Sequence, residues 1–316
     1  MSESPVLFVL GPTASGKTAL AAALCDAYDA EIISVDAAQA YRGMDIGTGK
    51  PDAAYLRRYP HHLIDIRAPS ESYSAAAFRD DALELIARIR GAGKLPILVG
   101  GTMFYFAALE HGLSELPGAD DDARASLARA IERDGLAAAH ARLARIDAKT
   151  AAAISPGDTQ RIQRALEIHQ LAARPPSEVM AQSAARPLPY PLIKVGLFAA
   201  DRRALHARIE ARFHRMLARG LVDEVRRIIA AVPAPQSQSC LRTVGYRQVR
   251  DHLRGALSHD EMSARAIAAT RRLAKRQLTW MRQQRNLVWV DGDDDAAESV
   301  RVYLRDCIER AACKVS

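Results

Sequence analysis

The sequence lacks three features that would place it in other classes of protein. No stretch reaches the roughly 18 consecutive apolar residues that a membrane-spanning helix needs. The first residues, Met1–Ser4, have neither the basic nor the apolar region of a signal peptide. The chain has only 4 cysteines in 316 residues and no C-x-x-C pair, so we expect neither a structural zinc site nor disulfide bonds. These absences predict a soluble cytoplasmic protein with no membrane partner.

Positive charge is abundant, and it is concentrated in the second half of the chain. The net charge is +7. Residues 1–195 carry 21 Lys and Arg against 23 Asp and Glu, whereas residues 196–316 carry 23 against 14. The segment 242–285 alone has 11 basic and 3 acidic residues. This distribution favours a polyanion such as nucleic acid as a partner, although a solvated Arg-rich helix face would give the same count.

Residues 11–18 form a complete phosphate loop of the pattern G-x-x-x-x-G-K-[ST]. The loop follows the apolar run 6–10 and precedes an Ala- and Leu-rich helix. Its backbone N–H groups and the helix N-terminus are expected to converge on a di- or triphosphate, such as that of ATP. Lys17 adds a cation, and the Thr18 hydroxyl is suited to bind Mg²⁺. The residues predicted to bind diphosphate or nucleotide are Gly11, Pro12, Thr13, Ala14, Ser15, Gly16, Lys17 and Thr18.

Strands and helices alternate in the first part of the chain. This alternation predicts an α/β fold with a parallel sheet of the P-loop NTPase-like class. Ligands of such sheets bind beyond the carboxyl ends of the strands. We expect the second helix to be capped by Ser72 or Ser74. The expected strands are 5–10, 31–35, 62–66 and 96–99, and the expected helices are 17–28 and 74–90.

Residues 115–190 differ in character, because they contain helical segments and no strand signal. We therefore predict an all-helical insertion domain at 115–190, within a core domain formed by 1–114 and 191–316. A strand is expected where the chain returns to the core, and the basic remainder is expected to be mostly helical. The expected elements after residue 115 are helices near 121–133, 136–146 and 159–173, a strand at 192–198, helices at 202–219, 221–230 and 260–284, a strand at 287–290 and a terminal helix.

The phosphate loop alone does not distinguish ATP hydrolysis, kinase action and diphosphate binding. The usual NTPase carries an acid at the end of a second apolar strand, but here the strand 95–99 is followed by Gly-Gly-Thr. The acid at a strand end is instead Asp36, which could support Mg²⁺, act as a general base toward an acceptor, or cap a helix. The polar, Gly-rich segment 36–51 is typical of a binding loop. Its Gln39 could read the edge of a base, and Tyr41 could stack on one.

Further motifs follow the phosphate loop in order along most of the chain. They are Ile33–Asp36, Tyr41–Thr48, Leu98–Met103, Asp158–Arg161 with Arg164–Glu167, Arg208–Arg212 with Met216, Val244–Gln248 and Thr270–Trp280. Together with the phosphate loop, they resemble the signatures of the tRNA dimethylallyltransferase family, also called tRNA isopentenyltransferases or IPP transferases. Two positions depart from the family's usual pattern. Ala37 stands where the family usually has Ser, and Gly49 stands where it usually has Ala.

The resemblance implies a prenyltransferase of tRNA modification. It implies transfer of a dimethylallyl group from dimethylallyl diphosphate to N6 of the adenine 3′-adjacent to the anticodon, with release of diphosphate. The implied partners are Mg²⁺ and the anticodon stem-loop of tRNA, and we expect a monomer. The implied catalytic residues are Asp36, which takes a proton from the amino group, and Thr13, Lys17 and Arg212, which bind the diphosphate.

The resemblance also implies which residues contact tRNA. Several of them are cationic and would mainly hold phosphates. Chemistry on a stacked adenine further requires that the base be turned out into a pocket. The implied tRNA contacts are Asp36, Ala37, Ala38, Gln39, Thr102, Arg124, Gln160, Arg161, Ile162, Gln163, Arg164, Arg242, Thr243, Val244, Gly245, Tyr246, Arg247, Lys275, Arg276, Gln277, Leu278, Thr279, Trp280, Met281 and Arg282.

Three other activities stay open on the sequence. An isopentenyltransferase acting on free adenine nucleotides would share the fold, but the insertion and the basic segment 242–285 favour tRNA. A small-molecule kinase of the P-loop class would use Asp36 as a base toward a hydroxyl group, and it would need no basic segment. A non-enzymatic RNA-binding protein with a nucleotide switch would not need both the Asp36 loop and the phosphate loop.

Overall fold

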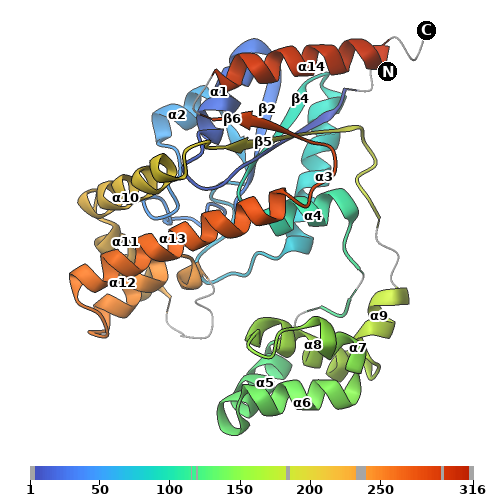
Figure 1. Cartoon of the computed structure of the whole chain (residues 1–316), viewed down its shortest axis with the longest axis vertical. Helices are drawn as coiled ribbons and strands as arrows, with labels where there is room; N and C mark the ends of the chain where they lie inside the picture. The colour runs from blue at the N-terminus through green and yellow to red at the C-terminus, as the bar shows by residue number, and fades with distance from the viewer. Residues whose placement is uncertain are drawn as a thin grey trace. The chain divides into compact units, whose positions relative to one another are not determined.

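The structure is a computed structural model, and it divides the chain into two compact units (Figure 1). The core unit consists of Met1–Glu110 and Pro189–Ser316, and the helical unit of His111–Leu188. The residues that the structure describes are 4–114, 116–118, 120–182, 186–232, 240–292 and 295–312.

A six-stranded parallel sheet forms the centre of the core unit, with the strand order β3-β2-β4-β1-β5-β6. The central strand β1 pairs with β4 on one side and with β5 on the other, so the first strand after the helical unit lies beside the first strand of the chain. The α/β fold predicted from the alternation of elements is therefore confirmed. The strands are β1 (Val6–Leu10), β2 (Ala30–Val35), β3 (His61–His62), β4 (Leu95–Gly100), β5 (Leu192–Phe198) and β6 (Leu287–Asp291).

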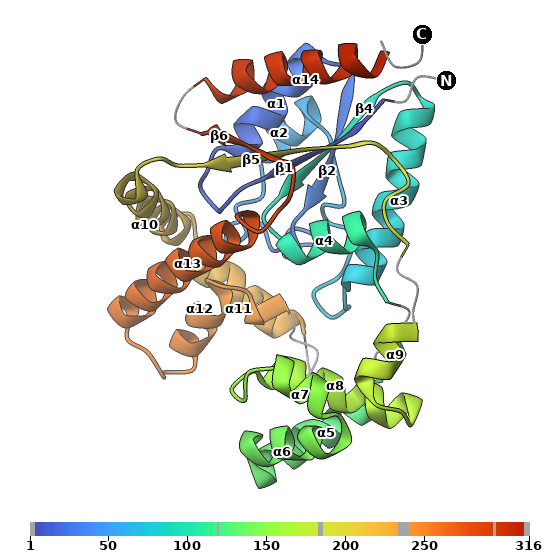
Figure 2. The same ribbon diagram turned by 45° about the vertical axis from the view of Figure 1, so that its right-hand side comes forward.

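Helices cover both faces of this sheet. Alternate residues of a strand point to opposite faces, so neighbouring residues of β1 contact different helices. Leu7 and Val9 belong to a hydrophobic cluster with α1 and α14, which lie on one face. Phe8 points to the other face, where its ring contacts that of Phe106 in α4 with centroids 4.9 Å apart. Figure 2 shows α3 on the same side of the sheet as α4. The bounds are α1 (Lys17–Ala27), α2 (Ala53–Arg58), α3 (Ala75–Gly91), α4 (Met103–His111) and α14 (Ala296–Ala312).

A second hydrophobic core lies among four C-terminal helices of the core unit, α10 to α13. The segment between β2 and α2, residues 36–52, contributes Tyr41 and Met44 to it. We call this segment the β2–α2 loop. The buried contacts anchor the loop to helices that come nearly two hundred residues later in the chain. The bounds are α10 (Arg202–Ala218), α11 (Leu221–Ala231), the 3₁₀ turn η2 (Cys240–Arg242), α12 (Tyr246–Leu253) and α13 (His259–Met281).

The helical unit has a small hydrophobic core of its own, which includes Leu127, Leu143, Ile162 and Leu166. Its structure contains helices throughout and no strand among its described residues. Each unit thus buries its own apolar surface. The bounds are α5 (Asp121–Asp134), α6 (Leu136–Ile146), α7 (Ala148–Ala153), α8 (Thr159–Ala172) and α9 (Pro176–Gln182).

The expected elements agree with the structure except in a few places. The strand expected at 62–66 is wrong, because β3 ends at His62. Leu63 and Asp65 have φ angles of 65° and 58°, which are incompatible with an extended strand. Ser74 caps α3, since its side chain accepts a hydrogen bond from the N–H of Ala77. Five helices were not predicted, namely α2, α4, α7, α9 and α12.

The helices that sequence patterns missed are short or carry no amphipathic pattern. The helix α4 is apolar almost throughout, so a period of 3.6 residues is not visible in it. The others have between 6 and 8 residues, which is about two turns. In the ranges that the structure describes, no helix is both long and apolar enough to cross a membrane.

Candidate active site

The phosphate loop lies between the end of β1 and the start of α1, at the carboxyl edge of the sheet. Gly16 occupies the N-cap position of α1 with a φ of 88°, a conformation that glycine adopts readily. Gly11 has no room for a side chain, because a Cβ there would lie 2.6 Å from Oγ of Ser15. The Nζ atom of Lys17 donates a hydrogen bond to the carbonyl oxygen of Pro12 at 2.6 Å. An internal hydrogen bond therefore closes the loop, while its binding of a diphosphate stays a prediction.

Three charged side chains interact at this edge of the sheet, those of Lys17, Asp36 and Arg212. Burial lowers the pKa of Lys17 to about 7, the charge of Arg212 lowers it further, and the charge of Asp36 opposes both effects. Burial also lowers the pKa of Arg212, and Asp36 again raises it. Two partly desolvated cations beside one another are typical of a site that binds an anion. The structure thus brings together three of the residues that the resemblance implied to be catalytic.

The carboxylate of Asp36 is oriented by its own loop. Its Oδ1 accepts hydrogen bonds from the backbone N–H groups of Ala38 at 2.9 Å and Gln39 at 3.3 Å. The N–H of Ala37 donates to Oγ1 of Thr102 at 3.0 Å. Side-chain hydrogen bonds thus tie the end of β2 to the start of α4, and they fix the direction in which Asp36 points. A carboxylate held this way can accept a proton from a substrate group in a defined orientation.

Gln277 connects the phosphate loop to the same region, although the sequence placed it among the tRNA contacts. Its side chain is buried in α13. Its Oε1 accepts a hydrogen bond from the N–H of Thr13 at 3.1 Å, and its Nε2 donates to the carbonyl oxygen of Gly101 at 2.8 Å. Gly101 precedes Thr102, which holds Ala37. One continuous set of hydrogen bonds therefore joins the phosphate loop to the loop that carries Asp36.

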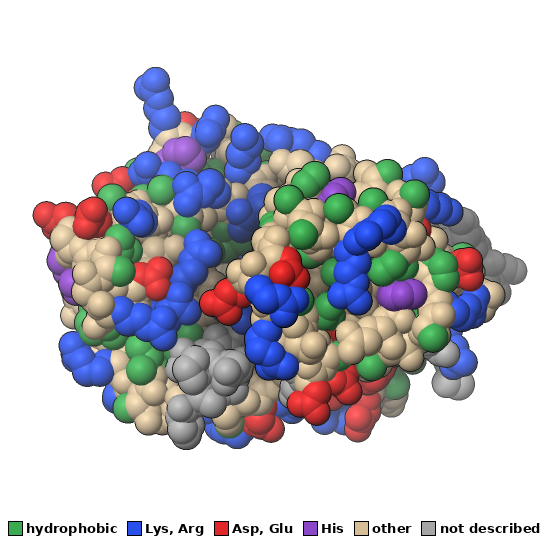
Figure 3. Space-filling model, turned by 90° about the horizontal axis from the view of Figure 1, so that it is seen from below, with side chains coloured by type: hydrophobic (Ala, Val, Ile, Leu, Met, Phe, Trp, Pro, Cys, Tyr) green, Lys and Arg blue, Asp and Glu red, His purple; other side chains and the backbone are tan. Residues whose placement is uncertain are grey.

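The C-terminal half of α13 separates into two faces. Lys275, Arg276, Thr279 and Arg282 are exposed, whereas Gln277 and Met281 are buried, and Leu278 and Trp280 are partly buried. This spacing follows the helical period of 3.6 residues. Figure 3 shows how Lys and Arg side chains spread over the face of the molecule drawn there. The exposed cations of α13 are available for phosphate contacts, while contact by the buried side chains with tRNA stays a prediction.

The predicted segment 242–247 runs from the last residue of η2, through the turn at 243–245, into the first residues of α12. Arg242 and Arg247 are exposed there, and Thr243 and Val244 are partly buried. Tyr246 is fully buried, and its hydroxyl donates a hydrogen bond to Glu224 at 2.5 Å. The two arginines are the side chains of this segment that can reach a polyanion from the surface.

The remaining predicted tRNA contacts belong to the helical unit. Ile162 lies in its hydrophobic core. Arg124 and Arg164 both form ion pairs with the buried carboxylate of Glu167, at 2.9 and 2.8 Å. The side chain of Gln163 donates to the carbonyl oxygen of Arg124 at 3.0 Å, while Gln160 and Arg161 lie exposed in the first turn of α8. The two arginines retain exposed surface, but much of their charge is compensated within the unit.

The site contains oxygen atoms of the kind that bind Mg²⁺. The Thr18 side chain is exposed in the first turn of α1. The Asp36 carboxylate also lies near the phosphate loop, because its charge opposes the lowering of the pKa of Lys17. Mg²⁺ usually takes one or two such protein ligands and completes its shell with water and phosphate oxygens. Among the residues described, no three His, Cys, Asp or Glu side chains are grouped as a metal site. The ion would therefore take most of its ligands from a bound diphosphate and water.

Sequence reasoning missed two buried charges that hold the β2–α2 loop, those of Lys50 within the loop and of Glu224 in α11. Glu224 shares a helix face with Leu221, Val225 and Ile228, all of which are buried. An acid at this period among apolar residues indicates a buried partner, and this signal could have identified Glu224. The position of Lys50 offers no comparable local signal.

The parallel sheet, with a phosphate loop at the carboxyl end of its central strand, defines the chain as a P-loop α/β protein. The model of the IPP transferase family matches residues 39–284. The chain therefore belongs to the tRNA dimethylallyltransferase family, whose family model is that of the IPP transferases.

Individual relatives agree with this assignment. A tRNA dimethylallyltransferase of Aromatoleum aromaticum is 54% identical over 284 residues, which cover 90% of this chain and 89% of that protein. One of Methylobacillus flagellatus is 49% identical over 311 residues, covering 98% and 94%. Among solved structures, a tRNA isopentenylpyrophosphate transferase of Bacillus halodurans superposes with a TM-score of 0.72 at 36% identity, covering 98% of each chain.

Proposed function

We propose that this chain transfers a dimethylallyl group from dimethylallyl diphosphate to N6 of the adenine that follows the anticodon of tRNA. The observation that carries the proposal is the set of Lys17, Arg212 and Asp36 at one edge of the sheet, in a member of this family. Two cations suit a diphosphate leaving group, and one oriented carboxylate suits an acceptor amine. No acid follows β4, where an NTPase would carry one.

The step requires that one bond form as another breaks. The N6 nitrogen attacks the C1 carbon of the dimethylallyl group, and the C1–O bond breaks with its electron pair left on the diphosphate. Negative charge thus grows on the diphosphate, where the loop N–H groups, Lys17 and Arg212 stabilise it. The proton of N6 passes to Asp36. When bound, Mg²⁺ would add positive charge beside the same oxygens, held through the Thr18 hydroxyl.

We propose further that tRNA is bound along exposed cations of the core unit and by the helical unit. Arg242, Arg247, Lys275, Arg276 and Arg282 supply positive charge on the surface of the core unit. Such contacts give affinity that falls with salt concentration rather than sequence discrimination. We expect the helical unit, predicted as residues 115–190, to contribute contacts through α5 and α8, and the chain to act as a cytoplasmic monomer.

The deciding experiment is transfer of radiolabelled dimethylallyl from its diphosphate to tRNA that lacks the modification, with Mg²⁺ present. Wild type should label the tRNA, and Asp36→Ala should reduce the rate by about 10²–10⁴-fold because the general base is lost. Asp29→Ala removes an exposed acid outside the site, and this control should behave as wild type.

Each alternative activity has its own outcome in this assay. Label in free AMP but none in tRNA would support an isopentenyltransferase of adenine nucleotides. Consumption of ATP with no label transferred would support a kinase or a nucleotide-switched RNA-binding protein. Either result would overturn the proposal.

A further inference from the structure

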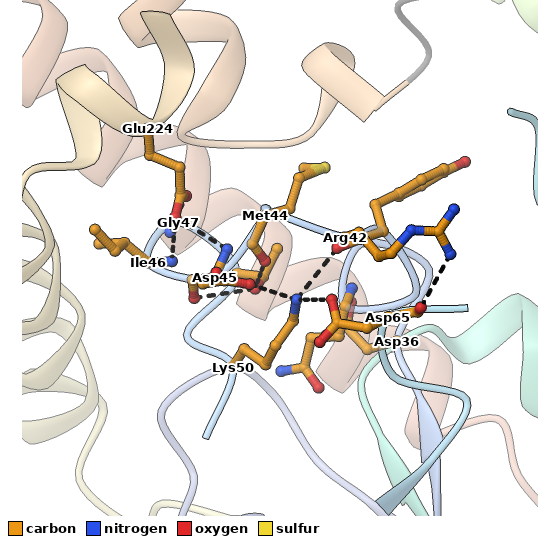
Figure 4. Close-up of polar contacts among 12 residues, drawn as sticks. Asp36, Arg42, Met44, Asp45, Ile46, Gly47, Lys50, Asp65 and Glu224 are labelled. Atoms are coloured by element: carbon orange, nitrogen blue, oxygen red, sulfur yellow. Dashed lines mark hydrogen bonds and ion pairs between the residues drawn. The ribbon is translucent and has the colours of Figure 1, made fainter. Parts of the chain in front are cut away.

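A buried carboxylate from α11 holds the turn of the β2–α2 loop (Figure 4). Glu224 has a relative exposure of 2%. Its Oε2 accepts hydrogen bonds from the backbone N–H groups of Asp45 at 3.0 Å and Ile46 at 2.7 Å. Its Oε1 accepts from the N–H of Gly47 at 3.0 Å and from the hydroxyl of Tyr246 at 2.5 Å. All four donors are neutral, so three consecutive peptide groups of the loop stabilise this buried anion.

These hydrogen bonds bind the loop strongly to the helices. Hydrogen bonds to an ionised acceptor are about twice as strong as neutral ones, and a buried charge is costly wherever a donor is withdrawn. Burial and the neighbouring Glu224 raise the pKa of Tyr246, so its hydroxyl keeps its proton and remains a donor. The loop backbone at residues 45–47 is therefore fixed relative to α11 and α12.

A buried ammonium group holds the other side of the same loop. The side chain of Lys50 is 4% exposed. Its Nζ donates to Oδ1 of Asp45 at 2.5 Å, to Oδ1 of Asp65 at 2.6 Å and to the carbonyl oxygen of Tyr41 at 3.2 Å. Asp65 has a φ of 58°, a conformation that Asp tolerates better than most residues. An anion and a cation thus fix the segment 41–50 from opposite sides.

The backbone of the fixed segment, residues 41–50, contacts the side chain of Arg212. The Nη2 of Arg212 donates a hydrogen bond to the carbonyl oxygen of Thr48 at 3.3 Å. The neighbouring Gly49 has a φ of +64°, and a Cβ on it would lie 1.9 Å from the same Nη2 atom. The guanidinium group therefore occupies the space that a side chain at position 49 would need. Gly49 is also one of the two positions where this chain departs from the usual residue of its family.

We propose that Glu224 and Lys50 are positioning residues that act on the diphosphate through Arg212. They fix the backbone of residues 45–50, and the carbonyl group of Thr48 and the bare Cα of Gly49 then set where the guanidinium group lies. A free arginine side chain loses rotamer entropy when it is fixed, so a position that is fixed in advance keeps this donor directed at the anion site before the anion binds. This inference rests on the proposed role of Arg212 as a ligand of the diphosphate.

A double-mutant cycle distinguishes positioning from a contribution to stability alone. Binding of inorganic pyrophosphate with Mg²⁺ is measured by calorimetry on the full chain, for Glu224→Gln, Arg212→Ala and the double variant. Melting curves set an assay temperature at which every variant is folded. Glu224→Gln should weaken pyrophosphate binding about tenfold, and the double variant should bind no more weakly than Arg212→Ala, because coupled residues are not additive.

Two further variants help to separate an effect on pyrophosphate binding from an effect on folding. Gly49→Ala leaves both buried ions in place but pushes the guanidinium group aside, so it should weaken pyrophosphate binding by a similar factor. Because an Ala side chain is strained at a φ of +64°, its melting temperature should fall modestly, and binding is measured at a temperature where the variant is folded. Asp223→Asn removes the exposed acid next to Glu224, which pairs with Arg226 on the surface. This control should bind pyrophosphate as wild type does.

Two results would overturn the inference. Glu224→Gln could lower the melting temperature yet keep the dissociation constant within about twofold, which would make Glu224 purely structural. Alternatively, the effects of Glu224→Gln and Arg212→Ala could multiply in the double variant, which would mean that they act independently. Failure of the proposed function would appear separately, as absence of label transfer to tRNA by the wild-type chain.

Discussion

The two loops that form the site are built in different ways. The phosphate loop, residues 11–18, binds through its own backbone, and its internal contacts include that of Lys17 with the carbonyl group of Pro12. The β2–α2 loop takes its shape from its own Lys50 together with charges that lie elsewhere, those of Glu224 in α11 and Asp65 beyond α2. A loop of the first kind is recognisable from eight residues. The conformation of the second depends on contacts across the whole core unit.

This difference explains how much the sequence could predict. The α/β sheet and the phosphate loop follow from local patterns, and the carboxyl edge of the sheet is where a parallel topology places the Asp36 loop. The inward direction of Gln277 and the buried role of Glu224 depend on packing between distant segments, which no local pattern records. The strand expected at 62–66 failed for a similar reason, because Lys50 and its partners hold Asp65 in a turn.

Among the variants that compare the two loops, removal of the phosphate-loop cation should have the largest effect. Lys17→Met should reduce the rate of dimethylallyl transfer by about 10²–10³-fold, because one preorganised donor to the leaving group is lost. Lys50→Met acts only through the second loop and should cost about tenfold. The measurement is label transfer to tRNA at saturating substrate. Lys94→Met, which removes a surface ion pair with Glu31, should transfer at the wild-type rate; equal losses for Lys17→Met and Lys50→Met would remove the distinction between the loops.

The bridge between the loops should have the next largest effect. Gln277→Ala leaves the N–H of Thr13 and the carbonyl group of Gly101 without their partner. Loss of such buried partners costs about 1–3 kcal/mol in the free energy of unfolding, which urea denaturation measures. Transfer should also slow, since both loops lose a common support. The exposed neighbour Arg276→Ala should leave the free energy of unfolding within about 0.5 kcal/mol of wild type.

The pH dependence of pyrophosphate binding tests the charge of Lys17 alone. Its pKa is about 7 in the folded chain against 10.5 in the unfolded one, so above pH 7 the folded chain has lost a proton that the unfolded chain retains. Through this group, stability rises with pH between these two values. Pyrophosphate favours the charged form, so binding at pH 8 should take up a proton.

Calorimetry in two buffers of different ionisation enthalpy measures this uptake. Wild type should take up close to one proton more than Lys17→Met at pH 8, and its affinity should fall about fivefold from pH 7 to pH 8 relative to that variant. Equal proton uptake by the two proteins would contradict the prediction, because it would show that the charge of Lys17 does not change when the anion binds.

The smallest expected effect concerns the hydroxyl group of Ser15. It is buried and has no hydrogen-bond partner among the residues that the structure describes. Ser15→Ala should therefore change the free energy of unfolding by less than about 0.5 kcal/mol. If the hydroxyl as well as the backbone of Ser15 binds diphosphate, the pyrophosphate dissociation constant will rise without a change in stability. An unchanged constant would show that this loop position contributes only its backbone.

The hydrogen bond from Thr13 to Gln277 joins residues 264 positions apart in the chain. A ribosome adds about 5–20 residues per second, so the phosphate loop is synthesised on the order of tens of seconds before the helix that braces it. During that interval the central strand also lacks its neighbour β5, which follows the helical unit. The nascent chain therefore contains the phosphate-loop sequence long before Gln277 is available to accept the hydrogen bond from Thr13. A chain that terminates before α13 would keep the motif but lose Gln277, which connects the phosphate loop to Gly101.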